Sequence, residues 1–535
     1  MPTLDWIGKQ AVVNHHREVP YHLLKCDKSL SVGDPGSGNL LVQGDNLIAL
    51  KALLPYYAGK VKCIYIDPPY NTGNESWVYN DNVNSPEIRR WLGKVVAAEA
   101  EDLSRHDKWL CMMYPRLALL QQFLREDGLL FVNIGTDEIG HLCVLLDEIF
   151  GRRNRICVAA WETSYTANQT AKHISETTDF VYVFAKNFDR AVIGKFDRSD
   201  EQLAKFKNSD NDARGPWKAE NLSAGKFYAA GQFEITGPTG KKFLPPDGRY
   251  WRCNEAQFNA WLADGRITFG KGGTGRPMLK KYRDELSQGL TPTTWWRHED
   301  FATAKDASTE LKGLFGGTAA FATPKPTRLL ERVLQIATNP GDLILDSFAG
   351  SGTTGHAVLK LNRAAPDKAP RRFILVEIVE QIAREVTAER VRRVADGYTT
   401  VKGERVEGLG GSFRFCTLSE SLFDEAGQIR SDVTFADLAA HVFFTETGEP
   451  IPKRASGKSP LIGVCHDVAF YLLFNGVLGD KRPAGGNVLT SAVLDSLPTH
   501  DGPKVIYGES CRLGEARLRR EGITFKQVPY EIKVR

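Results

Sequence analysis

Residues 61–71 read VKCIYIDPPYN, and the fold prediction rests on this stretch. The run Val61–Ile66 predicts a buried β-strand that stops at Asp67. In an open parallel sheet, ligands bind outside the carboxyl ends of the strands. We therefore expect Asp67 at a ligand-binding edge of a sheet.

The tetrapeptide Asp67-Pro68-Pro69-Tyr70 places two hydrogen-bond acceptors beside an aromatic ring. Each proline fixes φ and lacks an N–H, so the carbonyl of Pro68 can point outward next to the Asp67 carboxylate. Two such acceptors can hold both hydrogens of an NH2 group, and Tyr70 offers a flat face on which a base can stack. The tetrapeptide thus predicts a site for a planar amine. The alternative is a strand followed by a Pro-Pro turn, with Asp67 as a loop residue.

Strands and helices alternate on both sides of this stretch. We expect strands at 40–42, 129–134, 343–345 and 373–376, and helices at 46–54, 117–125, 139–150, 328–337, 356–361 and 378–394. This alternation predicts an α/β fold built on a mostly parallel sheet.

A glycine-rich loop, DSFAGSGTT at 346–354, follows the strand predicted at 343–345. Glycines there permit a sharp turn and let a ligand approach the backbone beside a helix N-terminus. Glu377 ends the next strand, where an acid suits the two hydroxyls of a ribose, as in dinucleotide folds. The loop alone is compatible with either NAD or S-adenosylmethionine (AdoMet).

The composition is that of a soluble globular protein, and a length of 535 residues predicts two or three domains. Nine cysteines without a CxxC pair indicate neither a zinc ribbon nor a disulfide framework. We find neither an apolar signal core nor a membrane span, which fits a reducing cytoplasm. The net charge of +4 is too small to indicate a nucleic-acid partner by itself.

Residues 151–320 differ from the rest of the chain. They contain six of the ten tryptophans, and their 26 Lys and Arg against 20 Asp and Glu give a net charge of +6. The alternation of strands and helices fades there and returns near 325. We therefore predict an inserted domain with a separate task.

The order of the two motifs resembles that of the β-class amino-methyltransferases of DNA, above all the modification (Mod) subunit of type III restriction–modification systems. The resemblance spans about residues 5 to 395. It rests on these stretches: Gln43-Gly44-Asp45-Asn46, Asp67-Pro68-Pro69-Tyr70-Asn71-Thr72, Tyr114-Pro115-Arg116-Leu117, Lys325-Pro326 and Asp346 to Thr354.

The resemblance implies a Rossmann-like AdoMet-dependent core in circularly permuted order, with a target-recognition domain between its halves. The implied domains are an extension (1–38), a catalytic half (39–150), a target-recognition domain (151–320), an AdoMet-binding half (321–400) and a C-terminal α/β appendage (401–535).

The resemblance also implies roles for single residues. Asp67 and Pro68 would hold the target amine, and Tyr70 would stack on its base. Asp67 is also expected at the cofactor. The remaining residues expected there are Asp45, Lys325, Thr327, Asp346, Phe348, Ala349, Gly350, Ser351, Gly352 and Glu377. Among them, Phe348 and Gly350 would line the methionine and sulfonium end, Glu377 would bind the ribose, and Asp45 would lie near the adenine.

The implied activity is methyl transfer to the N6 amine of adenine in double-stranded DNA, with the base flipped out of the helix. No metal is expected. Candidates for DNA reading in the insert are Arg249, Arg252, Lys280 and Lys281, although the more common role of each such residue is a solvated surface charge. We expect a homodimer, and because no Walker A sequence occurs, any restriction activity needs a separate helicase–nuclease subunit.

Three alternatives stay open at this stage. The first is methylation of cytosine N4, since only the acid at position 67, where a Ser tends to accompany cytosine, favours adenine. The second is a non-catalytic DNA-binding partner that kept the fold. The third is a nicotinamide-dependent oxidoreductase. The region after 400 can serve dimerisation, subunit contact or DNA binding.

Overall fold

The computed structural model describes residues 3–72, 101–286, 289–424, 426–474, 477 and 487–528, with the backbone alone at 101–104. Contacts divide the chain into two compact units. The main unit comprises Met1–Ile193 and Thr293–Arg535, and the insert unit comprises Gly194–Pro292. Among the described residues, every helix is too short or too polar to cross a bilayer.

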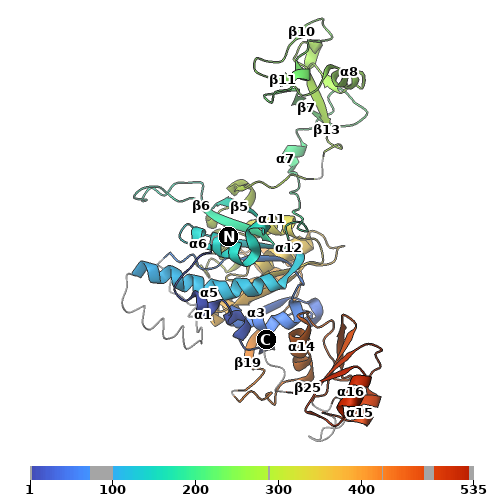
Figure 1. Cartoon of the computed structure of the whole chain (residues 1–535). Coiled ribbons are helices and arrows are strands. Elements are labelled where there is room, and N and C mark those ends of the chain that lie inside the picture. Colours follow the sequence, from blue (N-terminus) through green and yellow to red (C-terminus); the bar gives the residue numbers. More distant parts are fainter. Residues whose placement is uncertain are drawn as a thin grey trace. The chain divides into compact units, whose positions relative to one another are not determined.

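A ten-stranded sheet forms the centre of the main unit, in the order β1-β19-β2-β16-β15-β3-β4-β6-β5-β14 (Figure 1). Its strands are β1 (His22–Val32), β2 (Leu40–Gln43), β3 (Val61–Ile66), β4 (Leu124–Ile134), β5 (Arg155–Glu162), β6 (Thr178–Ala185), β14 (Trp295–Trp296), β15 (Leu343–Asp346), β16 (Arg372–Glu377) and β19 (Phe413–Ser421). The six strands from β19 to β4 are parallel to their neighbours. β1 and β6 pair antiparallel at either side of these six.

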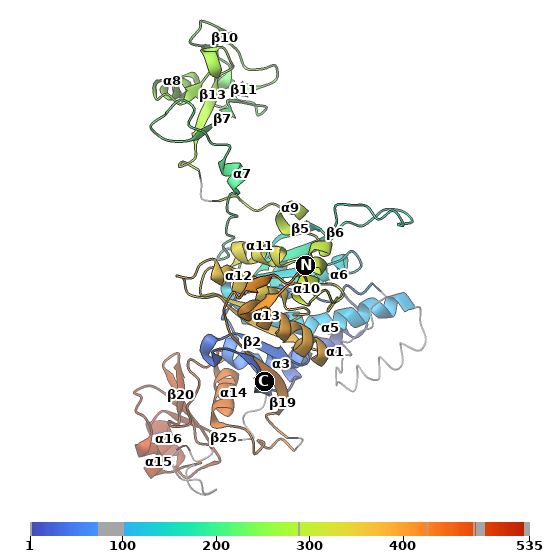
Figure 2. The ribbon, with the colours of Figure 1, turned by 180° about the vertical axis from the view of Figure 1, so that it is seen from behind.

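Helices cover both faces of this sheet. The connections β2–α3–β3 and β3–α5–β4 run in one direction along the sheet, whereas β15–α12–β16 runs in the other. Because crossovers between parallel strands are right-handed, the two groups lie on opposite faces; α5 stands in front in Figure 1 and α13 in Figure 2. The helices are α1 (Lys9–Val12), α2 (His15–Glu18), α3 (Asn46–Tyr57), α5 (Glu101–Phe123), α6 (Ile139–Leu146), α9 (His298–Phe301), α10 (Ala304–Leu314), α11 (Thr327–Ala337), α12 (Thr353–Arg363) and α13 (Glu389–Asp396).

The central strands are buried along their whole length, as helices on both faces require. All six residues of β3 and all four of β15 are buried. Since β3, β15 and β16 are neighbours that run in the same direction, their last residues or the residues just after them meet at one edge. These residues are Asp67, Asp346 and Glu377.

The structure confirms the predicted α/β fold and its mostly parallel core. The strand predicted at 61–66 is β3, and the helix at 328–337 is α11 with one more residue. The helix predicted at 117–125 is the end of the much longer α5, and 378–394 divides into η6 (Ile382–Ala388) and α13. Element type was predictable because the apolar periodicity is strong, whereas ends depend on neighbours that the local sequence does not contain.

The insert unit is shorter than the predicted 151–320 insert. Strands β5, β6 and β14 fall within 151–320 but belong to the main sheet. The insert unit itself is built from α7 (Asp200–Leu203), β7 (Trp217–Asn221), β8 (Ser223–Ala224), β9 (Ile235–Thr236), β10 (Lys242–Phe243), β11 (Tyr250–Trp251), α8 (Glu255–Ala263), β12 (Ile267–Thr268) and β13 (Met278–Tyr282). Its own core contains Trp251, Phe258 and Phe269.

The region after 400 is divided in the same way. β19 joins the main sheet, while β17 (Gly397–Thr399) and β18 (Arg405–Glu407) form a separate hairpin. A smaller α/β layer follows, with the sheet β20-β21-β23-β25. Its elements are α14 (Phe435–Thr447), β20 (Leu461–Cys465), β21 (Val468–Leu472), β22 (Val488–Leu489), α15 (Ser491–Ser496), β23 (Lys504–Gly508), β24 (Ser510–Cys511), α16 (Glu515–Arg520) and β25 (Ile523–Gln527).

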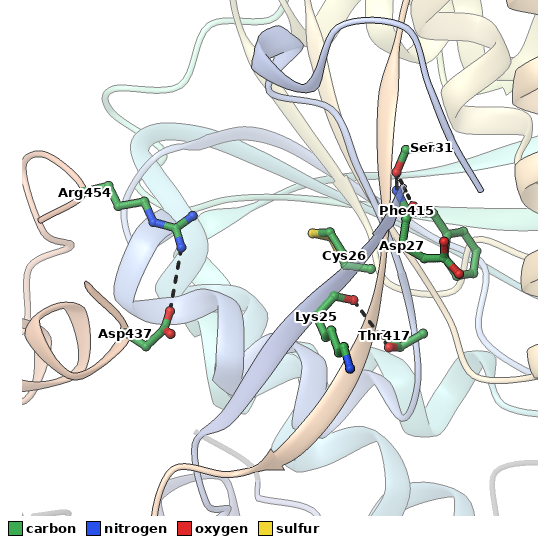
Figure 3. Close-up of a disulfide and its surroundings, with 9 residues drawn as sticks. Lys25, Cys26, Asp27, Ser31, Phe415, Thr417, Asp437 and Arg454 are labelled. Atoms are coloured by element: carbon green, nitrogen blue, oxygen red, sulfur yellow. Dashed lines mark hydrogen bonds and ion pairs between the residues drawn. A yellow bond between two sulfur atoms is a disulfide. The ribbon is translucent and has the colours of Figure 1, made fainter. Parts of the chain in front are cut away.

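One disulfide corrects an expectation from the cysteine spacing. Cys26 and Cys416 form a disulfide between β1 and β19, where the antiparallel register places the two residues opposite each other (Figure 3). They are 390 positions apart in the sequence, so their spacing carried no signal of the pairing. The expectation that the cysteines form no disulfide was therefore wrong for this pair.

We expect the buried strand β16 to contribute strongly to the free energy of unfolding. A matched pair of isoleucines can test this. Ile374 in β16 is 0% exposed, whereas Ile174 between β5 and β6 is 88% exposed. Ile374→Ala should lower the free energy of unfolding by about 2–5 kcal/mol, because it leaves a cavity in the core. Ile174→Ala should leave it within about 0.5 kcal/mol. Urea unfolding followed by tryptophan fluorescence measures both, and equal effects would contradict the placement of β16.

Candidate active site

A cavity of about 500 Å³ lies at the carboxyl edge of β3, β15 and β16. All four residues of the tetrapeptide line it, together with Lys325, Asp346, Phe348, Ala349, Gly350, Ser351 and Glu377. The structure thus brings most of the predicted site residues around one space, although they come from segments almost 300 positions apart. A volume of this size is in the range of small-molecule sites.

An ammonium group occupies the centre of the predicted amine site. Lys325 Nζ lies 2.7 Å from Asp67 Oδ2 and 5.0 Å from the centroid of the Tyr70 ring. The carboxylate and the ring therefore face the same cation, as in an ion pair combined with a cation–π contact. A cationic centre or the hydrogens of an amine suit this position, because both are attracted to a carboxylate and to the face of an aromatic ring.

Two side chains from neighbouring strands hold Tyr70. Its hydroxyl donates to Asp179 Oδ2 at 2.8 Å. Asn133 Nδ2 contacts the same hydroxyl and lies 3.4 Å from Asp67 Oδ1. Asn133 is buried one residue before the end of β4, and Asp179 is the second residue of β6. Burial raises the pKa of Asp179 and raises that of Tyr70 well above its usual value, so the phenol stays neutral and acts as a donor.

The glycine-rich loop turns sharply between β15 and α12. Gly350 has φ 49°, and a Cβ there would come within 3.1 Å of the Phe321 ring. Gly352 has φ 77° and precedes the first residue of α12. A larger residue at either position would be strained, so the glycines allow the close backbone approach that the sequence predicts.

Two buried acids hold this loop from below. Asp346 accepts a hydrogen bond from the Phe348 N–H at 3.0 Å and one from the Thr354 hydroxyl at 2.5 Å. Glu377 accepts from the Gly350 N–H at 2.9 Å and from the Val379 N–H at 3.0 Å. Burial raises the pKa of Asp346 to about 7 and also raises that of Glu377. Each Glu377 oxygen keeps a second lone pair for a ligand hydroxyl.

Three of the residues expected at the cofactor are not among those that line the cavity. Asp45 caps α3 through the Leu47 N–H at 2.7 Å and forms an ion pair with Arg116 at 3.1 Å. Thr327 is buried, and its hydroxyl accepts from Arg390 at 2.9 Å. Gly352 lies at the turn into α12. All three support the walls of the site through neighbouring elements.

The cavity contains residues that the sequence did not single out. Tyr65, Phe321, Ile378, Val379 and Ile382 line it as well. The Tyr65 hydroxyl is buried and has no hydrogen-bond partner among the residues that the structure describes, which marks a polar group directed at a place for a ligand. Tyr65 was hidden within the apolar strand VKCIYI, where an aromatic residue is typical of any core.

The four candidates for DNA reading differ in their surroundings. Lys280 is 8% exposed and forms ion pairs with Asp210 at 2.5 Å and Asp212 at 3.0 Å. It therefore stabilises the insert unit internally and is not a surface charge. Arg249 donates to the Ser223 carbonyl at 2.8 Å. Arg252 and Lys281 both lie within 4 Å of Glu220, on the more exposed side.

The buried Asp346 carboxyl predicts a pH-dependent stability. In an unfolded chain it ionises near pH 4, whereas in the folded protein its pKa is about 7. Between these values the folded state keeps a proton that the unfolded state has lost, so stability falls as pH rises and levels off above about 7. Asp346→Asn removes the ionisation; its amide oxygen can still accept from the Phe348 N–H, while its NH2 group can donate to the Thr354 hydroxyl oxygen.

We therefore expect the unfolding free energy of Asp346→Asn, relative to the original protein, to grow from pH about 4 to about 7. Urea unfolding at several pH values in that window, without added cofactor, measures the difference. Curves that stay parallel throughout the window would contradict the buried, proton-holding carboxyl.

The comparisons with known proteins agree with this arrangement. A family model described as DNA methylase (N6_N4_Mtase) matches residues 61–389, which include both motifs. The EcoPI Mod subunit of a type III restriction-modification enzyme, from Escherichia phage P1, is 30% identical over 501 residues, which cover 83% of this chain and 74% of the relative. The StyLTI Mod subunit from Salmonella typhimurium is 29% identical over 487 residues, covering 86% and 72%.

Solved structures give a weaker likeness. The PvuII DNA methyltransferase (cytosine-N4-specific) has a TM-score of 0.34 and 13% identity, covering 67% of this chain and 90% of its own. A complex of M1.HpyAVI with SAM has a TM-score of 0.30 and 14% identity, covering 66% and 98%. Scores this low do not decide the fold, which rests on the strand order given above.

The family match covers more than half of the chain and includes the acceptor tetrapeptide, the glycine-rich loop and the cavity between them. The phage P1 relative matches over more than two thirds of both proteins. The chain belongs to the DNA methylase family.

Proposed function

We propose that this protein transfers a methyl group from AdoMet to the N6 amine of adenine in double-stranded DNA. The proposal rests on one observation: the tetrapeptide and the glycine-rich loop line the same cavity. A methyl donor held by the loop would lie within reach of an amine held by Asp67. The named relatives, which are Mod subunits of type III restriction-modification enzymes, support the same activity.

The residues around the cavity fit AdoMet. Glu377 offers buried acceptors for ribose hydroxyls, and Ile378, Val379 and Ile382 offer an apolar wall for the adenine ring. Asp67 and Asp346 bring carboxyls to the same space, beside the ring of Phe348. Carboxylates and aromatic rings both favour a sulfonium cation. When bound, AdoMet supplies an electrophilic methyl group whose departure needs no acid.

The role of the protein is then to prepare the amine. The nitrogen of an aromatic amine is a poor nucleophile because its lone pair is delocalised into the ring. Asp67 and the Pro68 carbonyl would accept its two hydrogens and draw the nitrogen toward tetrahedral geometry, which frees the lone pair. Because Lys325 contacts Asp67 Oδ2 at 2.7 Å, whereas Asn133 lies 3.4 Å from Oδ1, we assign Oδ1 to the amine. Asp67 is also placed to take the proton that the nitrogen loses after transfer.

The target base must leave the double helix to reach this cavity, since its amine is covered inside a duplex. Flipping costs a few kcal/mol, and stacking on Tyr70 would offset part of that cost. Asp179 and Asn133 hold Tyr70 at its hydroxyl end, while Lys325 Nζ lies over the ring, so a stacked base would take the place of this ammonium group. These contacts restrict the motion of the Tyr70 ring, which suits a surface on which a base stacks.

We assign DNA reading to the inserted region, which lies where the family resemblance implies a target-recognition domain. The insert unit alone has 17 Lys and Arg against 12 Asp and Glu, a net charge of +5 that exceeds the +4 of the whole chain. Cations in excess attract phosphates, while side chains such as Arg252 can read base edges. The remaining 436 residues are close to neutral, so the charge for DNA is concentrated in the insert.

We further propose a separate restriction subunit, in line with the names of the relatives as Mod subunits of type III restriction-modification enzymes. We also propose a homodimer, as the family resemblance implies. The cytoplasm is the compartment in which we place the reaction, because it contains both DNA and AdoMet.

Asp67→Ala should abolish methyl transfer and leave AdoMet binding intact, because it removes the acceptor for the amine and spares the loop. We expect a loss of at least roughly 100-fold in kcat, typical of removing one key electrostatic group. Asp189→Ala, which changes an exposed aspartate after β6, is the matched control. Mass spectrometry of nucleosides from treated DNA measures the product, and calorimetry measures AdoMet binding.

Two outcomes would contradict this part of the proposal. Asp67→Ala with the activity of Asp189→Ala would exclude the mechanism. N4-methylcytosine as the only product of the unaltered protein would exclude adenine as the target and leave the methyl transfer itself standing.

Removal of the insert unit should separate DNA recognition from cofactor binding. Phe196 and Leu290 exchange two backbone hydrogen bonds of 2.9 and 2.8 Å, so the two ends of the unit are adjacent and a short Gly-Ser linker can replace Gly194–Pro292. We expect unchanged AdoMet affinity and at least roughly tenfold weaker binding to DNA, measured by fluorescence anisotropy. Site-specific methylation at full rate after the deletion would contradict the assignment.

A further inference from the structure

A cluster of four polar side chains lies directly behind the tetrapeptide. Its centre is the Glu138 carboxylate, which is 0% exposed. His106 Nδ1 lies 2.6 Å from Glu138 Oε1, and His141 Nδ1 lies 2.8 Å from Oε2. The Asn71 amide also donates to Oε1. The network therefore joins the loop after β3, helix α5 and helix α6.

The distances identify the cluster as a hydrogen-bonded network and argue against a metal site. Two His and one Glu are a common set of zinc ligands, and the facing atoms are close enough to be considered for an ion. Two ligands about 2.1 Å from one zinc in tetrahedral geometry lie roughly 3.4 Å apart. The separations of 2.6 and 2.8 Å are those of direct hydrogen bonds.

The network acts on a backbone conformation that needs support. Asn71 has φ 60°, in the left-handed region that a residue with a side chain rarely adopts. Such a conformation persists only where its surroundings fix it. Asn71 is fully buried and follows Tyr70 directly, so its conformation sets how the chain leaves the tetrapeptide.

A second contact from the same helix holds the tetrapeptide itself. The Trp109 indole N–H donates to the Pro69 carbonyl at 2.7 Å. Trp109 and His106 are three positions apart on α5 and therefore lie on one face of it. Through these two residues, α5 is tied to Pro69 directly and to Asn71 by way of Glu138. Pro68, which is assigned to the amine, directly precedes Pro69. Tyr70, which is assigned to the base, lies between Pro69 and Asn71.

We propose that Glu138 is a positioning residue for methyl transfer, which acts through Asn71 and His106 to fix the orientation of Tyr70 and of the Pro68 carbonyl. This inference rests on the proposed function. It concerns the alignment of the acceptors, not the binding of AdoMet, because the network contacts neither the glycine-rich loop nor Glu377. An error of about 1 Å in such an alignment can reduce a rate roughly 100-fold.

The test is a double-mutant cycle of Glu138→Gln and Asn71→Ala, measured in kcat and in the affinity for AdoMet. Each single change should lower kcat roughly 10- to 100-fold and leave AdoMet affinity and KM for AdoMet unchanged. The double variant should be no slower than the slower single variant, since both changes break one unit. Losses that multiply in the double variant, or a kcat of Glu138→Gln within twofold of the original, would overturn the proposal.

A matched control is available in the same unit. Glu162 accepts from His298 Nδ1 at 2.7 Å, a His–Glu pair of the same geometry that does not contact the tetrapeptide. Glu162→Gln should leave kcat unchanged. An equal loss in Glu162→Gln would mean that breaking any such pair slows the enzyme, and this too would overturn the proposal.

A second pair of variants keeps the test decisive if Glu138→Gln does not fold. His106→Asn retains a donor close to the position of Nδ1, whereas His106→Ala removes it. With both proteins folded by circular dichroism, His106→Asn should retain several times more activity than His106→Ala. Equal activities would overturn the proposal, as would a zinc-induced rise in melting temperature that is lost in His141→Ala. If the unaltered protein does not methylate DNA at all, the proposed function fails instead.

Discussion

The crowding of carboxyl groups at one edge of the sheet is the constraint on which the site depends. Asp67, Asp346 and Glu377 all lie there because β3, β15 and β16 are parallel neighbours. Burial and mutual repulsion make three ionised acids in one apolar cavity costly. The structure responds in two ways: Lys325 pairs with Asp67, and the pKa of Asp346 and of Glu377 rises. A site with this excess of acceptors favours a ligand that brings positive charge and hydroxyls.

The same constraint explains why both halves of the core are needed. The Asp67–Lys325 ion pair spans 258 positions, and β3 pairs with β15 across a similar distance. Neither half contains a complete cavity, because the acceptors lie on 61–70 and the glycine-rich loop on 346–352. The insert unit can interrupt the chain between them because its ends meet at Phe196 and Leu290. The insert unit therefore takes a place in the chain that a short loop between strands β6 and β14 could also take.

The sequence predicted features that are continuous along the chain and missed contacts that depend on the pairing and packing of distant segments. Strand β3, the tetrapeptide and the loop at 346–354 were found because each is a continuous pattern with a physical meaning. Asn133 and Asp179 were not, since only the pairing of β4 with β6 brings them to Tyr70. Glu138 was not singled out by the sequence, yet it is fully buried and contacts His106 of α5. The Cys26–Cys416 pair and the ends of the insert unit likewise depend on strand register.

The geometry also limits where base selectivity can reside. A carboxylate and a carbonyl accept hydrogens from any exocyclic amine, so the proposed contacts of Asp67 and Pro68 do not by themselves distinguish adenine N6 from cytosine N4, and the acid at position 67 favours adenine only through the family resemblance. Tyr70 stacks on either ring, because every base has a π-face. Selectivity must therefore come from contacts with the ring edges and ring size, or from the DNA sequence read beside the target. Phe321, Lys325 and the walls of the cavity are the groups in position to measure ring size. In the proposed mechanism the tetrapeptide determines that an amine is methylated, and residues outside it determine which base carries that amine.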